Sequence, residues 1–588
     1  MSTARSASAT RCLLGLCACL WALLAHAAEP PGTRFEAPRV VAFGDVHGAY
    51  SGLVELLTQA EVISDDLEWQ GGATHLVSLG DLLDRGPDSR LVMDLLRRLQ
   101  GEARAAGGRV HVVLGNHELM NMTGDLRYVA PGEFAAFAEP GSSGDAGRPA
   151  GFVELAAAFT PDGTYGAWLM AQPTVVIVND SVFVHGGLSP LAGQYSPEEL
   201  NATVRARLEE LLTLRAELEA GAILAPHREV TEAALELRQS LADAAIAEPW
   251  RAAVARFIEL AEDPLMATEG PLWYRGNATC HALLETPLLT RVLEHWQVRR
   301  VVVGHTPTPD YRVRSRLGGR VLLADTGMNT DYYGGQPAAV IIDDQGPRVI
   351  YAGRPGTTPP DEDPGTPLHP LSEPELLTAL ESSDITTRPD LDSPHGQAVE
   401  LHGAFAGAPV QAWFRPLGRR QIEAELAAFR LDRLLELNLA APVVRRTLDG
   451  VDGTVTALWA GSITEAERAE RGLMPLNTCS GSDSAFLLLY AFDALIQNQA
   501  RTTTNMHYDR RTWRLASTGH QASFGRGRQL PAYLAASPQQ LPAAVAQALR
   551  RLDEDLLEAA LGDDLNRAQR RALLSRRDVM FRTWTIGD

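Results

Sequence analysis

The sequence contains no lysine, so all 53 of its basic residues are arginine, and any mechanism that needs a lysine amine is excluded. The 73 acidic residues outnumber them, and the formal net charge of −20 argues against nucleic acid as the main partner. Beyond the first 27 residues, no apolar run is long enough to span a bilayer. A chain of 588 residues is too long for a single core, so we expect two or three domains.

The apolar stretch near the start of the chain has the features of a secretory signal. Arg5 and Arg11 precede the apolar residues 12–24, and Ala25-His26-Ala27 has the small-x-small pattern of a cleavage site. This pattern predicts a signal peptide over residues 1–27. It also predicts a periplasmic or secreted protein that keeps no membrane span once the signal is removed.

Cysteine is scarce, and only two of the five cysteines lie outside this segment. In an oxidising compartment these two, Cys280 and Cys479, could form a disulfide. A lipoprotein signal that uses Cys19 is an alternative to simple cleavage, but Cys17 stands where a small or β-branched residue is usual. Both interpretations predict export of the chain.

Five apolar segments have the composition of buried strands, and a polar cluster follows each of them. The clusters are Gly44-Asp45-Val46-His47-Gly48, Gly80-Asp81-Leu82-Leu83-Asp84-Arg85-Gly86, Gly115-Asn116-His117-Glu118, His185-Gly186-Gly187 and Gly304-His305-Thr306. Parallel strands place such residues at one edge of a sheet, where oxygen and nitrogen ligands can share a metal. Any single cluster is equally typical of an ordinary polar turn. Five in succession are not explained by coincidence.

In this order, the five motifs resemble those of calcineurin-like metallophosphoesterases of the phosphoprotein-phosphatase branch. The run from Gly115 to Tyr128 is most similar to the Shewanella-like protein phosphatases. The resemblance covers about residues 39–351 and implies an α/β domain over 34–353, built as a four-layer β-sandwich flanked by helices. It also implies hydrolysis of phosphomonoesters by a water that two divalent ions (manganese, iron or zinc) activate. A protein phosphorylated on serine, threonine or tyrosine is the favoured substrate.

The resemblance further implies a role for each site residue. Six residues would hold the metals, with Asp81 bridging: Asp45, His47, Asp81, Asn116, His185 and His305. The remaining roles are those of His117 as general acid, Asp84 as the group that orients it, and Arg85 and Arg275 as phosphate contacts. These roles suit the chemistry, because a histidine beside a carboxylate can protonate an alkoxide and arginine presents a fork to phosphate oxygens.

Two other functions stay open. Enzymes that hydrolyse dinucleoside polyphosphates share the five motifs, so a nucleotide hydrolase is the first alternative. The second is a metal-binding scaffold whose interaction domain matters more than turnover. The complete set of acid, base and ligand residues argues against the scaffold. In contrast to these residues, His111 lies inside a predicted strand and is more typical of a core residue than of a ligand.

Three further segments complete the organisation. Residues 197–262 carry leucines at helical spacing and predict a helical insert, either a packing appendage or a lid that selects substrates. Residues 354–373 are rich in proline, glycine and acid and predict a linker. Residues 374–588 predict an α+β domain, with a helical pair over 542–577.

The loop over residues 498–505 partly resembles the catalytic loop of atypical, kinase-like folds. The positions that correspond to the catalytic and metal-binding aspartates, the strand lysine and its helix partner are Ala500, Gly519, Arg415 and either Glu423 or Glu425. Phosphoryl transfer needs the two lost carboxylates. The resemblance therefore implies a pseudokinase with no kinase activity and an unknown partner, and an unrelated α+β domain is the alternative.

Overall fold

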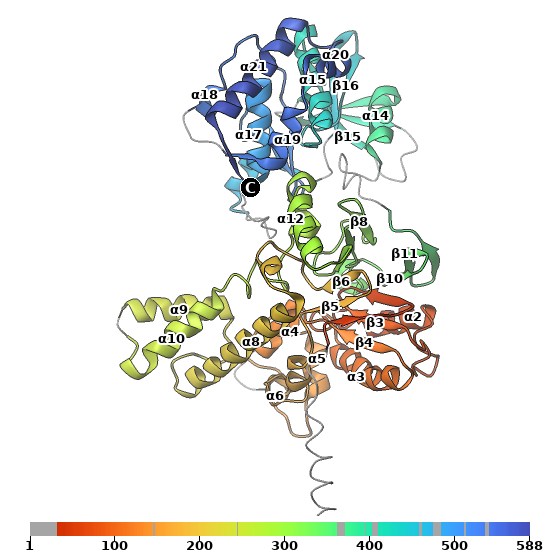
Figure 1. Ribbon diagram of the computed structural model, residues 1–588, viewed down its shortest axis with the longest axis vertical. Helices are drawn as coiled ribbons and strands as arrows, with labels where there is room; N and C mark the ends of the chain where they lie inside the picture. Colours follow the sequence, from red (N-terminus) through yellow and green to blue (C-terminus); the bar gives the residue numbers. More distant parts are fainter. Residues whose placement is uncertain are drawn as a thin grey trace, which may run out of the picture.

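The computed structural model describes two domains, which Figure 1 shows one above the other. The described residues are 32–144, 147–243, 245–360, 371–393, 396–402, 410–457, 461–473, 484–510, 513–535 and 540–587. The predicted signal peptide lies outside them, and so does Cys479. Cys280 is disulfide-bonded, and its pairing with Cys479 stays a prediction. Among the described helices, none combines the length and the apolar composition that a membrane crossing requires.

Two six-stranded sheets form the centre of the first domain. In spatial order, one contains β1 (Arg34–Phe35), β5 (Val175–Val178), β6 (Ser181–Val184), β7 (Arg300–Val303), β9 (Val321–Leu323) and β8 (Arg314–Arg316). The other contains β12 (Arg354–Thr357), β11 (Gly346–Tyr351), β10 (Ala338–Asp343), β2 (Val40–Phe43), β3 (His75–Ser78) and β4 (Arg109–Val112). The pairs β2–β3, β3–β4 and β6–β7 are parallel.

Side-chain alternation along the strands explains the layers. Val40 and Ala42 of β2 belong to the core between the sheets, together with Phe183 of β6. Val41 and Phe43 point the other way, into the core shared with α2 (Tyr50–Gln59) and α3 (Ser89–Ala105). A strand that is buried on both faces is continuously apolar, as β2 is. The predicted α/β class and its helix-flanked sandwich are confirmed.

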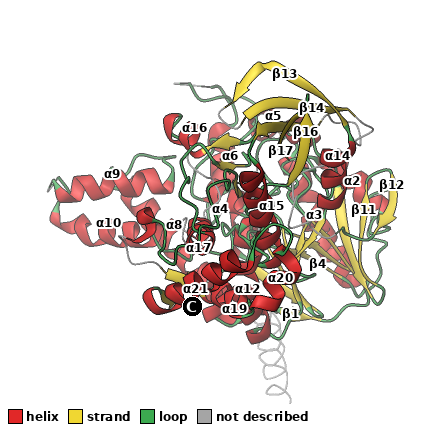
Figure 2. Cartoon of the chain, turned by 90° about the horizontal axis from the view of Figure 1, so that it is seen from above, coloured by secondary structure: helices red, strands yellow, loops and turns green. Residues whose placement is uncertain are grey.

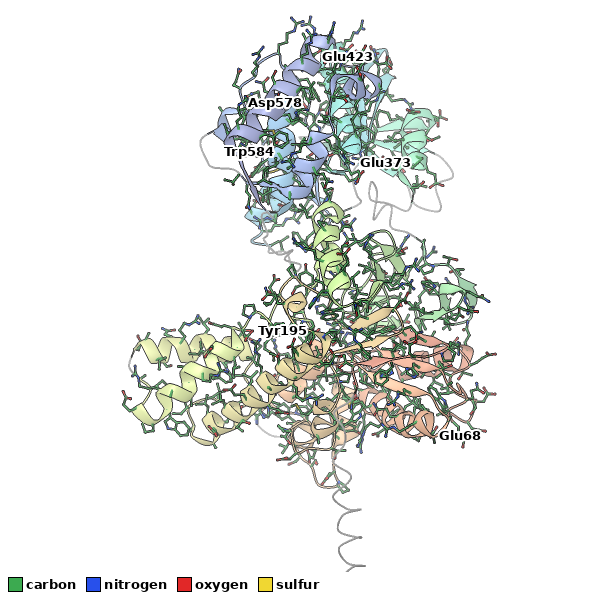
Figure 3. The ribbon with its side chains drawn as sticks, in the orientation of Figure 1. Glu68, Tyr195, Glu373, Glu423, Asp578 and Trp584 are labelled. Atoms are coloured by element: carbon green, nitrogen blue, oxygen red, sulfur yellow. The ribbon has the colours of Figure 1, made fainter. Side chains whose placement is uncertain are left out.

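The predicted helical insert consists of α8 (Pro197–Ala220), α9 (Val230–Ala242) and α10 (Glu248–Ala261). Ser196 begins α8 with a capping box, in which its hydroxyl accepts from the backbone N–H of Glu199. Tyr195, labelled in Figure 3, precedes this cap and packs against the core of the first domain. Figures 1 and 2 show α9 and α10 side by side, projecting away from the sheets.

The second domain has a five-stranded antiparallel sheet and a helical part. The sheet order is β13 (Asp384–Ser393), β14 (Gly396–His402), β15 (Val410–Pro416), β17 (Val451–Ala457) and β16 (Val443–Leu448), with α14 (Glu373–Ser382) and α15 (Arg419–Leu434) beside it. The helical part contains α17 (Ser484–Ile496), a small sheet of β18 (Ile463–Thr464), β19 (Met506–Tyr508) and β20 (Leu515–Ser517), and the C-terminal helices. This is the predicted α+β composition.

Two boundaries differ from the prediction. The predicted linker starts too early, because residues 354–357 form β12 and pair with β11. As an edge strand, β12 tolerates proline, which cannot donate to a central ladder. The predicted helical pair over 542–577 is three helices, α19 (Ala543–Arg550), α20 (Glu554–Leu561) and α21 (Arg567–Thr583). The side chains of Asp553 and Asn566 cap the last two and start each of them anew.

Candidate active site

The five predicted clusters converge at one edge of the two sheets. Asp45 and His47 follow β2, Asp81 and Asp84 follow β3, and the other residues follow β4, β6 and β7. The site carboxylates and imidazoles are buried. Several of them, including His47 and Asp81, have positive φ, a strained conformation that often marks functional turns.

A first group of acceptor atoms surrounds His47. Its Nδ1 lies 2.7 Å from the carbonyl oxygen of Leu83, to which it must donate, so Nε2 carries a lone pair. That Nε2 lies 3.7 Å from Oδ2 of Asp81 and 3.9 Å from Oδ2 of Asp45. Burial lowers the pKa of His47 well below its usual value, so the ring is the neutral form that binds metals.

A second group surrounds His185. Its Nδ1 lies 2.8 Å from the carbonyl oxygen of Leu79 and donates to it, which leaves Nε2 as an acceptor. The neighbours of Nε2 are Oδ1 of Asn116 at 2.9 Å, Nδ1 of His305 at 3.1 Å and Oδ1 of Asp81 at 3.3 Å. Nδ2 of Asn116 points at Met120, which directs its oxygen toward the group. Nε2 of His305 is buried and has no hydrogen-bond partner among the described residues.

Both groups therefore fit divalent cations. Acceptors that face acceptors repel one another unless a cation lies between them, and mixed oxygen and nitrogen ligands suit manganese, iron or zinc. Burial and the charges of Asp325 and Asp81 raise the pKa of Asp45 well above its usual value. The site therefore has an excess of buried negative charge, which bound cations would neutralise. Asp81 takes part in both groups of candidate metal ligands, one with His47 and His117 and the other with His185 and His305.

His117 stands at the first turn of α4 (Asn116–Met122). Its Nδ1 lies 2.5 Å from Oδ2 of Asp84, whose other oxygen accepts from Nδ2 of Asn121 at 3.0 Å. Burial alone would lower the pKa of His117, but the charges of Asp81 and Asp84 and this hydrogen bond outweigh it, and the pKa is raised. The pair is thus a histidine held by a carboxylate, with Nε2 facing the candidate metal ligands.

The two predicted arginines lie on either side of the site. Arg85 places Nη1 2.6 Å from Nε2 of His47 and Nη2 3.1 Å from Nε2 of His117. Arg275 donates through Nη1 to the carbonyl oxygen of His305 at 2.6 Å and to Oγ1 of Thr306 at 3.0 Å. The guanidinium groups thus supply positive charge next to the clustered acceptors, where a phosphate would need it.

Sequence reasoning missed two parts of the site. Tyr332 and Tyr333 place their rings 5.3 Å from the Arg85 guanidinium carbon, an aromatic contact that orients this side chain. Glu118 is fully buried and accepts from the backbone N–H groups of Gly115, Asp81 and Leu82, each at 2.8 Å. Glu118 thereby ties together the turns after β3 and β4. Its place directly after Asn116-His117 was the available signal.

The match to a known family agrees with this geometry. Residues 38–309 match the family model described as calcineurin-like phosphoesterase. These residues form a calcineurin-like phosphoesterase domain. The predicted family is confirmed, and with it a phosphoric ester hydrolase as the class of enzyme.

Relatives of this phosphoesterase include two Shewanella-like protein phosphatases. Phosphatase 2 of Arabidopsis thaliana is 36% identical over 205 residues, which are 29% of this chain and 52% of the relative. Phosphatase 1 of Plasmodium berghei is 28% identical over 308 residues, 52% of this chain and 72% of the relative. A solved structure, the cold-active protein-tyrosine phosphatase of a psychrophilic Shewanella species, is 26% identical with a TM-score of 0.41, covering 56% of this chain and 82% of its own. This chain therefore spans about half the length of the Arabidopsis relative.

The helical insert of the phosphoesterase domain borders the helix that carries His117. A cavity of about 330 Å³ lies between α4, the insert and the segment before Arg275. Its walls include Met120 of α4, Leu211 and Leu260 of the insert, and Trp273. The ring of Trp273 lies 6.0 Å from that of His305, so the cavity adjoins the site.

In the second domain, the structure brings together one of the two predicted kinase-like pairs. Nη1 of Arg415 lies 3.8 Å from Oε1 of Glu425. Glu423 instead pairs with Arg419 at 2.8 Å. The kinase-like interpretation of this domain stays a prediction.

Proposed function

We propose that the phosphoesterase domain hydrolyses phosphomonoesters and that phosphorylated protein is its substrate. The observation that carries the proposal is the convergence of two buried groups of acceptors on the shared carboxylate of Asp81. The names of the Arabidopsis and Plasmodium relatives support phosphoprotein as the substrate. The predicted signal peptide supports a periplasmic or secreted location for this activity.

Two divalent ions would complete the site. Asp45, His47 and Asp81 would hold one ion. The ligands of the other would be Asp81, Asn116, His185 and His305. When bound, such ions lower the pKa of a water and neutralise phosphate charge. The carboxylate and amide oxygens and the neutral imidazole nitrogens provide the mixed oxygen and nitrogen ligands that these ions accept.

The chain's own groups would complete the chemistry. Asp84 accepts a hydrogen bond from Nδ1–H of His117. The proton that His117 gives up would therefore be the one on Nε2, the nitrogen that faces the substrate. His117 would donate this proton to the departing alkoxide. Its raised pKa favours the protonated ring, the form that can donate, near neutral pH. Arg85 and Arg275 would bind the phosphate oxygens through their planar, charged guanidinium groups.

The test is hydrolysis of an aryl phosphate by the purified chain, with and without manganese, beside Asp81→Asn. Asp81→Asn removes a ligand that both ions would share. Turnover should fall more than about 100-fold, because removing a residue that only hydrogen-bonds to a metal ligand already costs up to that much. The amount of bound metal should also decrease. Asp65→Asn, the same change at an exposed acid, is the matched control and should keep full turnover.

Two results would contradict the proposal. Absence of turnover with any divalent metal, although metal is bound, would favour the scaffold. Turnover confined to dinucleoside polyphosphates in a panel that includes phosphopeptides would favour the nucleotide hydrolase.

A further inference from the structure

We infer that the second domain positions Arg275, acting through the first turn of α12 (Ala282–His295). The inference rests on the proposed function, in which Arg275 binds the phosphate. The second domain would then help to hold a phosphate-binding residue of the site in position. The contacts form a continuous path from the second domain to the guanidinium group.

The path begins where α12 meets the second domain. Figure 1 shows α12 reaching from the first domain up to α19, and the two helices are in contact. Leu283 and Leu284, in the first turn of α12, pack against the core of the second domain. Leucines that are partly buried in the core of another domain tie the start of α12 to that domain.

His281 adds a polar contact at the same place. Its Nδ1 accepts from the backbone N–H of Leu283 at 3.2 Å and so caps α12. Because Nδ1 is the acceptor, Nε2 carries the proton, and it donates to the carbonyl oxygen of Leu437 in the second domain. One imidazole thus fixes the start of the helix and joins it to the other domain. Cys280, the preceding residue, is disulfide-bonded.

Glu285 carries the path from α12 to the site. It is buried, and its carboxylate accepts from the hydroxyl of Tyr274 at 3.0 Å and from Nδ2 of Asn277 at 2.7 Å. Tyr274 and Asn277 stand on the two sides of Arg275 in the chain. Arg316 holds the same segment, α11 (Gly276–Thr279), by donating to the carbonyl oxygen of Asn277 at 2.7 Å.

Arg275 is the end of the path. Its donation to His305 and Thr306 aims the guanidinium at the site. Tyr274 and Asn277 both donate to Glu285, and the side chain of Asn277 is also hydrogen-bonded to the backbone of Leu188. A shift of the first turn of α12 would therefore move Tyr274 and Asn277 together. Packed side chains and buried hydrogen-bonded networks carry energetic coupling of this kind between distant parts of a protein.

The experiment compares full-length variants by the inhibition constant for orthophosphate and by KM for an aryl phosphate. His281→Asn keeps a good helix cap but is too short to reach Leu437, and Leu283→Ser/Leu284→Ser weakens the apolar contact. We expect both constants to rise about 3- to 10-fold with kcat nearly unchanged, as expected when phosphate is held less well in the ground and transition states alike. Arg291→Ala, at an exposed position of the same helix, is the control and should change neither constant.

A double-mutant cycle identifies the route. In an Arg275→Ala background, His281→Asn should cause no further change in the orthophosphate constant, because the residue it positions is gone. Equal effects in both backgrounds would overturn the inference. Amide hydrogen exchange across residues 273–280 should be faster in His281→Asn and in the serine variant than in Arg291→Ala.

The exchange measurement separates the two proposals. Failure of the proposed function would appear as no turnover by the unsubstituted chain, and the exchange result would still decide the coupling. Unchanged exchange over 273–280 in both interface variants would overturn the coupling even in an active phosphatase.

Discussion

The polar cluster around Asp493 in the second domain and the one around Asp81 in the first are both buried. At Asp493 every contact joins a donor to an acceptor. Arg501 donates through Nε and Nη2 to its two oxygens, each at 2.8 Å. Asn498 and Tyr533 add donors at 3.0 and 2.9 Å. This cluster is closed, since its charges and hydrogen bonds are satisfied within the chain.

At Asp81, Oδ1 accepts from the backbone N–H of His117 at 3.0 Å, but both carboxylate oxygens also face acceptors. The carboxylate faces the lone-pair nitrogens of His47 and His185, and Nε2 of His305 is left without a described partner. The comparison teaches that burial of polar groups does not by itself distinguish a functional site from a structural network. The distinguishing feature is a mismatch of donors and acceptors that an added cation would resolve.

The largest expected effect tests the cluster around Asp81, which we call the open cluster because an added cation would complete its contacts. His117→Asn removes the proton donor and should lower kcat for an alkyl phosphate, such as a phosphoserine peptide, by about 10²–10⁴-fold. The loss should be much smaller for an aryl phosphate with an acidic leaving group, which departs without a proton. The measurement is kcat for both substrates, and bound metal should stay constant. An equal loss on the two substrates would show that His117 does not act as the acid.

The sequence predicts the open cluster better than the closed one, for a physical reason. Each residue of the open cluster follows a buried strand, and parallel strands bring their carboxyl ends to one edge. The order of the motifs therefore places Asp45, Asn116 and His305 together although they are far apart in the chain. The helix over residues 484–496 is equally predictable from its composition, but no spacing pairs Asp493 on it with Arg501.

What the sequence misses depends on contacts between distant segments. His281 meets Leu437 across 156 residues, and neither belongs to a motif or a periodic pattern. Tyr332 and Tyr333 reach Arg85 in the same way from the short helix α13 (Thr330–Tyr333), which follows β9. Periodicity predicts which face of an element is buried, but the partner on that face is determined by the packing of the whole chain.

A second prediction applies the same substitution to both clusters in metal-free protein. Asp493→Asn leaves the buried charge of Arg501 without its counter-ion and should lower the free energy of unfolding by about 3–5 kcal/mol. Asp45→Asn removes a charge that burial and neighbouring carboxylates disfavour, so it should cause no loss. Its Oδ1 can still accept from the backbone N–H of His305.

Calorimetry in the presence of a chelator measures both changes. The unsubstituted chain in the same buffer is the reference, and manganese should stabilise it more than it stabilises Asp45→Asn. A large loss of stability in metal-free Asp45→Asn would show that the first cluster is also closed, and would remove the contrast between the two.

The smallest effect concerns a histidine pair outside the site, His75 and His111. Nε2 of His111 and Nδ1 of His75 are 3.1 Å apart, a donor and an acceptor, and burial lowers their pKa values to about 3 and about 4. The folded pair is neutral, whereas the unfolded chain takes up protons below about pH 6.5. Stability should therefore be full above pH 6.5 and fall as the pH drops toward 4. His111→Gln should flatten this slope, measured by urea unfolding in chelator, and leave turnover at pH 7.5 unchanged. An unaltered slope, or lost turnover, would mean that this pair is not the satisfied core contact that its hydrogen bond indicates.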